Sequence, residues 1–223
     1  MAIITNIEDL RVLHKKRTPK MFYDYADSGS WTESTYRANE SDFQKIKFRQ
    51  RVAVDMNNRT TKTTMVGQEV SMPVALAPTG LTGMQHADGE ILAAIAAEKF
   101  GVPFCLSTMS ICSIEDVAER TTKPFWFQLY VMKDRGFIER LIERAKAAKC
   151  SALVLTLDLQ ILGQRHKDLK NGLTAPPKLT IANMINMASK PRWCMGMAMT
   201  PRRTFRNIVG HASGVGDMSS LSS

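Results

Sequence analysis

The sequence lacks any long apolar run. No stretch of its 223 residues approaches the ~18 apolar residues that a membrane-spanning helix requires. The N-terminus, MAIITNIEDLRVLHKK, contains acidic residues and no small-residue cleavage site, so we expect no signal peptide. Apolar residues make up 44% of the chain and charged residues 23%, a balance typical of soluble globular proteins.

Cysteine is scarce, and its spacing argues against a common metal site. Cys105, Cys112, Cys150 and Cys194 are far apart and form no CxxC pair. A zinc site is therefore not expected. Reduced thiols are the simpler interpretation, and they indicate a cytoplasmic location.

Acidic residues are few in the C-terminal part of the chain. The whole chain carries a net charge of +9, and residues 159–223 hold nine Lys or Arg against two Asp, which gives +7. Such a segment is usually a solvated surface. It can also serve an anionic partner, either nucleic acid or a membrane face.

Residues 1–72 predict a helical segment followed by a hairpin. Thr5 and Glu8 match a capping box, so a helix should run to about Lys16. Pro19 can open a second helix that Gly29 closes, and residues 32–43 predict a third. The stretch TTKTTMVGQEVSM predicts two short strands around a turn at Gly67-Gln68.

Apolar strands alternate with helices over residues 73–158. The predicted strands are 73–78, 103–108, 125–130 and 151–158, and the predicted helices are 88–101, 113–120 and 134–149. Strands joined by short helices imply right-handed crossovers and a parallel sheet. The fold is then either a doubly wound sheet or a (β/α)8 barrel.

Polar or small residues follow each predicted strand, and they favour the barrel. They are Pro78, Thr79 and Gly80; Ser107 and Thr108; Gln128 and Tyr130; Thr156 and Asp158. A barrel gathers such ends around one mouth. A doubly wound fold would instead call for a GxGxxG loop, which APTGLTGM does not provide. We therefore predict an α/β TIM barrel of which four βα units are recognisable, with 159–223 as an insertion or lid after the fourth strand.

Several motifs in order resemble one family. They are PKMFYDYADSG, SMPVALAPTGLTGM, LSTMSICSIEDVA, WFQLYVMKDRG and LTLDLQILGQRHKDLKNG. Together they resemble the FMN-dependent 2-hydroxy acid dehydrogenases and oxidases, and the forms APTG and SDFQKIKFRQRV are most similar to the bacterial L-lactate dehydrogenases. The resemblance implies an FMN-linked barrel truncated before its fifth strand.

The resemblance also implies a role for particular residues. The flavin would lie against the backbone of Ala77, Pro78, Thr79 and Gly80 and accept hydrogen bonds from, or donate them to, Ser107, Gln128 and Thr156. Tyr25, Tyr130 and Arg165 would contact the substrate, Tyr25 at its carboxylate and Tyr130 near its hydroxyl. Asp158 would pair with the catalytic histidine. A phenol and a guanidinium suit a 2-hydroxy carboxylate, because charge-assisted hydrogen bonds are the stronger kind.

The residues alone also allow structural interpretations. Tyr25 could pack a helix on the body of the protein, and Thr156 with Asp158 could cap a loop. Gln128 is harder to explain in this way, because an amide inside FWFQLY needs a buried partner.

The histidine that Asp158 would serve has no counterpart in the sequence. The family places this base in a late HGGRQ-type motif, which is absent, and none of His14, His86, His166 and His211 belongs to such a motif. The family reaction is oxidation of L-lactate or a similar (S)-2-hydroxy acid to the 2-oxo acid by hydride transfer to flavin N5. This chain by itself is expected to be inactive. The alternative is a non-catalytic half-barrel that acts through another chain.

Residues 171–208 combine methionines and a tryptophan with basic flanks. The family resemblance implies either a mobile cover or a membrane-docking segment, and apolar residues with basic neighbours suit the anionic inner face of the cytoplasmic membrane. Electrons would then pass to quinone, a cytochrome or oxygen. No nucleic-acid module is visible, and the resemblance implies a homotetramer.

Overall fold

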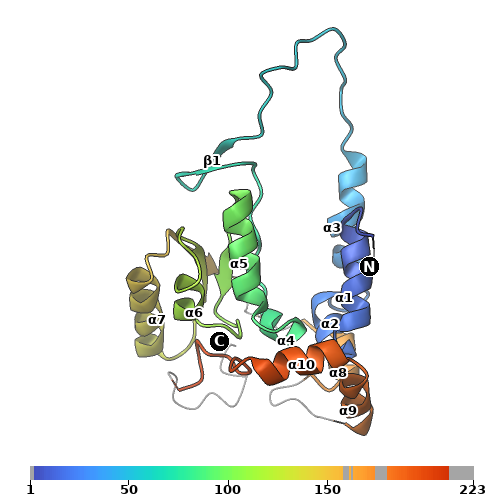
Figure 1. Ribbon diagram of the computed structural model, residues 1–223, viewed down its shortest axis with the longest axis vertical. Helices are drawn as coiled ribbons and strands as arrows, with labels where there is room; N and C mark the ends of the chain where they lie inside the picture. Colours follow the sequence, from blue (N-terminus) through green and yellow to red (C-terminus); the bar gives the residue numbers. More distant parts are fainter. Residues whose placement is uncertain (1–2, 158–160, 162, 174–179, 211–223) are drawn as a thin grey trace.

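A parallel sheet forms the centre of the protein. The computed structural model describes residues 3–157, 161, 163–173 and 180–210. Within them, β3 (Cys105–Ser107), β4 (Trp126–Tyr130) and β5 (Ala152–Thr156) lie in the order β3-β4-β5. The register sets Ser107 beside Gln128, and Tyr130 beside Thr156. Strands and helices alternate along the chain, so the described part is an α/β fold (Figure 1).

Helices pack on one face of this sheet, and the sequence predicted each of the three. They are α5 (Gly89–Phe100), α6 (Ile114–Ala118) and α7 (Arg135–Ala147). The buried core joins Phe127 and Leu129 of β4 to Phe137 and Leu141 of α7. A capping box between Ser113 and Asp116 starts α6. The face of β4 toward the helices is therefore apolar and buried, and the opposite face carries the polar row described below.

The strand predicted for 73–78 is wrong in its extent. Of this segment, only Leu76 forms a bridge, in parallel orientation, to Phe104, the residue that precedes β3. Pro73 and Pro78 carry no N–H for a ladder, which limits pairing at both ends of the segment. Val74 and Leu76 remain 49% and 37% exposed.

The N-terminal elements agree with the prediction in kind and differ at their ends. They are α1 (Ile7–Arg17), α2 (Lys20–Ala26), α3 (Ser34–Ser41) and the 3₁₀ helix η1 (Asp42–Lys45). Asn6, and not Thr5, caps α1, because the amide and hydroxyl of Thr5 both bind the Asp9 carboxylate. Asp27, and not Gly29, ends α2. The sequence pattern located these helices but could not resolve which of several adjacent polar residues serves as the cap.

A hairpin and a long exposed segment complete the N-terminal region. The hairpin strands are β1 (Thr63–Met65) and β2 (Gln68–Val70), and their turn is Val66-Gly67 and not Gly67-Gln68. Residues 46–62 link η1 to β1 as an extended arm away from the body (Figure 1). Phe48 and Val52 on this arm are 94% and 90% exposed.

The region after β5 is more helical than the sequence indicated. It contains α8 (His166–Lys170), α9 (Ile181–Ala188) and α10 (Pro191–Met199), within the segment for which the sequence predicted an insertion or lid without defined helices. Thr180 caps α9 and Pro191 opens α10. The helices dock on the N-terminal part: Trp193 donates to the carbonyl of Met84 at 2.7 Å and stacks on Phe22. No helix among the described residues is long and apolar enough to cross a bilayer.

Candidate functional site

A polar row crosses the carboxyl ends of the three strands. Gln128 is 1% exposed, and its Oε1 accepts hydrogen bonds from the hydroxyl of Ser107 at 3.2 Å and the amide of Thr108 at 3.3 Å. Its Nε2 donates to the hydroxyl of Thr156 at 2.7 Å. The amide inside FWFQLY thus has the partners that its burial demands. Three of the residues predicted from sequence are therefore in contact, one from each strand.

The segment from Ala77 to Gly80 passes close to this row. Its first three residues are exposed, and the carbonyls of Ala77 and Thr79 accept hydrogen bonds from the hydroxyls of Thr79 and Thr82. Just beyond the segment, the amide of Leu81 donates to the carbonyl of Met109 at 3.1 Å, which ties the segment to the loop after β3. A Cβ at Gly80 would lie 2.8 Å from the hydroxyl oxygen of Tyr25. Glycine is thus what allows the phenol to lie against this backbone.

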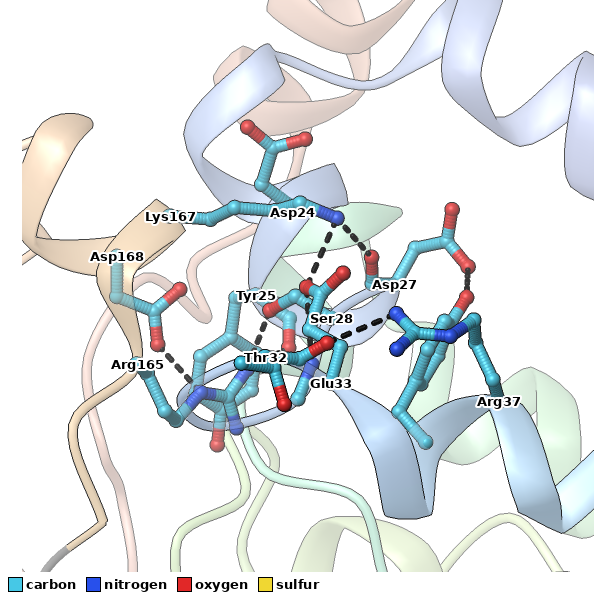
Figure 2. Close-up of polar contacts among 12 residues, drawn as sticks. Asp24, Tyr25, Asp27, Ser28, Thr32, Glu33, Arg37, Arg165, Lys167 and Asp168 are labelled. Carbon is cyan, nitrogen blue, oxygen red and sulfur yellow. Dashed lines mark hydrogen bonds and ion pairs between the residues drawn. The ribbon is translucent and has the colours of Figure 1, made fainter.

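Tyr25 and Arg165 form the second part of the site. The guanidinium carbon of Arg165 lies 4.7 Å from the centroid of the Tyr25 ring. The same guanidinium donates to the carbonyl of Tyr25 and to the hydroxyl of Ser28, and its Nε is 2.7 Å from the Asp168 carboxylate (Figure 2). Burial raises the pKa of the Tyr25 phenol, and the positive charge of Arg165 opposes this shift.

Tyr130 links the two parts. It is the last residue of β4 and pairs in register with Thr156. Its amide donates to the hydroxyl of Thr108 at 3.3 Å. Its phenol is near enough to Tyr25 to contribute to the raised pKa of that residue. The predicted substrate and cofactor residues that the structure describes therefore converge on one end of the sheet.

Polar contacts that the sequence did not reveal hold α8 in place. Asn171 donates to the Asp24 carboxylate at 2.7 Å, and Lys20 pairs with the same carboxylate. Lys167 binds Glu33 at 3.0 Å (Figure 2). These contacts fix the helix that follows Arg165 against α2 and α3. Asp24 and Asn171 are 147 residues apart in sequence, so no local pattern signals their contact.

The acid–base pair expected from the sequence falls outside the part of the chain that the structure describes. Asp158 and His211 lie outside the described residues. The three described histidines have other contacts: His14 packs on Tyr23, His86 binds the carbonyl of Ala87, and His166 packs on Trp31. Burial lowers the pKa of His14. Among the described residues there is also no group of acidic, histidine and cysteine side chains that could hold a metal ion.

The chemistry of the polar row fits part of a flavin site. The row offers neutral hydroxyls and an amide, and residues 77–79 beside it are exposed. The pyrimidine edge of an isoalloxazine is itself neutral, with alternating donors and acceptors, so uncharged partners match it. The hydroxyl hydrogen of Thr156 can serve as a further donor, because its oxygen is the acceptor for Gln128.

Comparison with known proteins agrees with this chemistry. The model of the FMN-dependent dehydrogenase family matches residues 14–220. The L-lactate dehydrogenase of Alcaligenes faecalis is 42% identical over 200 residues, which are 90% of this chain and 52% of that protein. The L-lactate dehydrogenase of Haemophilus influenzae (strain PittEE) is 42% identical over 219 residues, 96% of this chain and 57% of that protein.

A solved structure extends the comparison to the fold. The structure described as the monotopic membrane protein (S)-mandelate dehydrogenase superposes with a TM-score of 0.87 at 33% identity. The match covers 99% of this chain and 58% of the other. The chain thus spans about half the length of the curated relatives it matches.

Proposed function

The chain belongs to the family of FMN-dependent dehydrogenases, and we propose from this premise that it supplies the N-terminal part of a site that oxidises a 2-hydroxy acid. The substrate would be L-lactate or a similar (S)-2-hydroxy acid, and the product the 2-oxo acid. The architecture would be the first four βα units of a TIM barrel. The observation that carries the proposal is the contact of Ser107, Gln128 and Thr156 in one row beside Tyr25 and Arg165.

FMN is the cofactor in this proposal. When bound, it would supply the two-electron chemistry that the protein side chains cannot perform. Gln128 and Thr156 would hold its pyrimidine part, Ser107 a neighbouring position, and the backbone from Ala77 to Gly80 would line one face. Gln128 is locked by its neighbours, so the row is preorganised and needs little rearrangement on binding.

The substrate would bind beside the stacked pair of Tyr25 and Arg165, with Tyr130 close by. Arg165 offers a permanent positive charge for the carboxylate, and Tyr25 a hydroxyl that stays protonated because burial raises its pKa. Tyr130 would orient the substrate hydroxyl. Asp158 would pair with a catalytic histidine, and none of the three described histidines is placed for this task. We therefore propose that the 223-residue chain binds but does not turn over substrate.

An absorption spectrum tests both halves of this proposal. The purified chain is mixed with FMN, freed of excess cofactor, and scanned before and after addition of L-lactate without oxygen. We expect a retained flavin band that L-lactate does not bleach. Absence of the band would contradict the cofactor assignment, and bleaching would contradict the proposal that the chain is inactive by itself.

The helices after β5 support a peripheral membrane location. Ile181, Ile185 and Met199 are 73%, 66% and 80% exposed, and Lys190 and Arg192 lie between them in sequence. An amphipathic helical surface of this kind binds lipid interfaces, and anionic lipid strengthens the binding through the basic residues. We propose that residues 171–208 dock on the inner face of the cytoplasmic membrane. The whole protein would there pass electrons to quinone or a cytochrome, with oxygen as the other acceptor.

The exposed face of β5 supports a second candidate function. Leu153, Leu155 and Leu157 are 47%, 49% and 75% exposed, although Phe127 and Leu129 on the same face of β4 are buried under helices. An uncovered apolar strand at a sheet edge favours association. The chain would then be a non-catalytic half-barrel that acts through another chain, and the whole protein would be a homotetramer. Light scattering of the purified chain tests this candidate, since a stable monomer at micromolar concentration would contradict it.

A further inference from the structure

Glu90 is a buried carboxylate that no role above explains. It lies in the first turn of α5 and is 1% exposed. A buried carboxylate is expensive unless hydrogen bonds satisfy it. Here the donors are backbone amides and not charged side chains: Oε1 accepts from Gly83 and from Ile111, each at 2.9 Å.

The two amides belong to two connections of the candidate site, called here the two loops: the first runs into the short helix α4 (Thr82–Gln85), which contains Gly83, and the second follows β3. Gly83 follows the segment from Ala77 to Gly80, and Ile111 follows β3 and Ser107. One oxygen atom of Glu90 therefore joins the two loops that would flank the flavin. This bond adds to the direct one between the amide of Leu81 and the carbonyl of Met109.

The two loops are in close contact around Gly83. A Cβ at Gly83 would lie 2.6 Å from Cβ of Ile111 and 2.9 Å from the second oxygen of Glu90. The neighbouring thiol of Cys112 has a raised pKa, first because it is buried and next because the charge of Glu90 is close. The carboxylate is thus enclosed, and it cannot reorient without moving one of the two loops.

We propose that Glu90 is a positioning residue that locks these two loops together and so sets the flavin-facing backbone and the Tyr25 contact at Gly80. The locking part rests on the contacts alone, and its consequence for FMN rests on the proposed function. A shift of the first loop would displace the Tyr25 side chain, because Gly80 lies directly against the Tyr25 hydroxyl.

Two conservative variants separate the position of the acceptor from its charge. Glu90→Gln keeps an acceptor oxygen at the same reach and removes the charge, whereas Glu90→Asp keeps the charge and withdraws the oxygen by one methylene. Glu98 provides the matched control, because it lies on the same helix and accepts from the backbone amide of Thr122 at 2.9 Å, far from both loops. Glu98→Gln and Glu98→Asp are made in parallel.

The readouts are hydrogen exchange at the amides of Gly83 and Ile111 and the affinity of the chain for FMN. We expect Glu90→Asp to speed exchange at both amides and to weaken FMN binding by about tenfold each, with Glu90→Gln close to the parent chain and both Glu98 variants unchanged. Unchanged exchange in Glu90→Asp, an equal loss in Glu90→Gln, or faster exchange without weaker FMN binding would each overturn the proposal. If the parent chain binds no FMN, the proposed function fails, and the exchange rates still decide whether Glu90 locks the loops.

Discussion

The guanidinium of Arg165 lies over the ring of Tyr25, 4.7 Å from its centroid, although 140 residues separate the two in sequence. The stacked pair is braced by the ion pair from Arg165 to Asp168 at 2.7 Å. A planar cation on an aromatic face keeps its edge available for further hydrogen bonds. The pair therefore brings a phenol and a cation together, as the proposed carboxylate site requires.

This pairing predicts how Tyr25 titrates. Burial raises its pKa, and the positive charge of Arg165 lowers it by stabilising the phenolate. Arg165→Met should therefore raise the pKa of Tyr25 further, as measured by the tyrosinate absorbance that Tyr25→Phe removes. Arg37→Met, which removes an exposed guanidinium bound to the carbonyl of Thr32, should leave it unchanged. An unchanged pKa of Tyr25 after Arg165→Met would contradict the stacked arrangement.

Gly80 should not tolerate a side chain. A Cβ there would lie 2.8 Å from the Tyr25 hydroxyl and 3.4 Å from Met109, so Gly80→Ala should destabilise the chain by about 1–3 kcal/mol in urea unfolding. Gly136 in the first turn of α7 is the control, because its nearest contacts, 3.3 and 3.4 Å away, are side-chain ends. Gly136→Ala should be neutral or stabilising by up to ~1 kcal/mol. Equal effects of the two substitutions would argue against the contact between Gly80 and Tyr25.

The ion pair between Glu115 and Arg144 should make stability depend on acid pH. Hydrogen bonds from Arg144 lower the pKa of Glu115 to about 2. A carboxyl group whose pKa is lowered by folding stabilises the folded state at pH values above its unfolded-state pKa of roughly 4.3. This stabilisation is lost as the pH falls toward the folded-state pKa of about 2. Glu115→Gln should remove this part of the acid sensitivity, by less than ~1 kcal/mol because the pair is half exposed.

Urea unfolding at several pH values between neutral and acid measures this effect. Glu143→Gln is the control, since Glu143 pairs with Lys146 in a more exposed position on α7, the helix that carries Arg144. A Glu115→Gln curve parallel to that of the parent chain through the acid range would rule out the contribution.

Membrane docking should depend on the apolar residues of α9 and α10. The double variant Ile185→Ser, Met199→Ser should bind vesicles of anionic phospholipid about tenfold less in co-sedimentation, because both side chains are largely exposed and available for insertion. Val52→Ser alters a side chain that is 90% exposed on the arm and should have no effect. Binding by the parent chain should weaken with salt. No binding of the parent chain even at low salt would remove the docking proposal.

The local patterns of the sequence were sufficient for most of the α/β part. Helical spacing of Phe137, Ile138 and Leu141 located α7, and the polar residues after successive strands located the row at Gln128. Both signals are periodic, and burial of one face enforces them. The strand predicted for 73–78 was too long. Its apolar residues fit the strand pattern, but its prolines and its open edge do not support a hydrogen-bonded ladder over the whole segment.

Contacts between distant segments could not be read in the same way. The bond from Asn171 to Asp24 and the bonds of Glu90 to two loops join residues that share no period or motif. Glu90 in particular looked like an ordinary acidic residue in the first turn of a helix, where a favourable interaction with the helix dipole is common. Only the fold shows that the carboxylate points inward.

The central claim is that Gln128 holds a flavin in the polar row, and FMN titration tests it most directly. FMN fluorescence is measured in three separate titrations, one with the folded parent chain, one with Gln128→Met and one with the exposed control Gln50→Met. The account predicts one FMN per parent chain, the same affinity for Gln50→Met, and about tenfold weaker binding for Gln128→Met, because the amide that orders the row is lost. Failure of the folded parent chain to bind FMN, or equal affinity of all three chains, would contradict it.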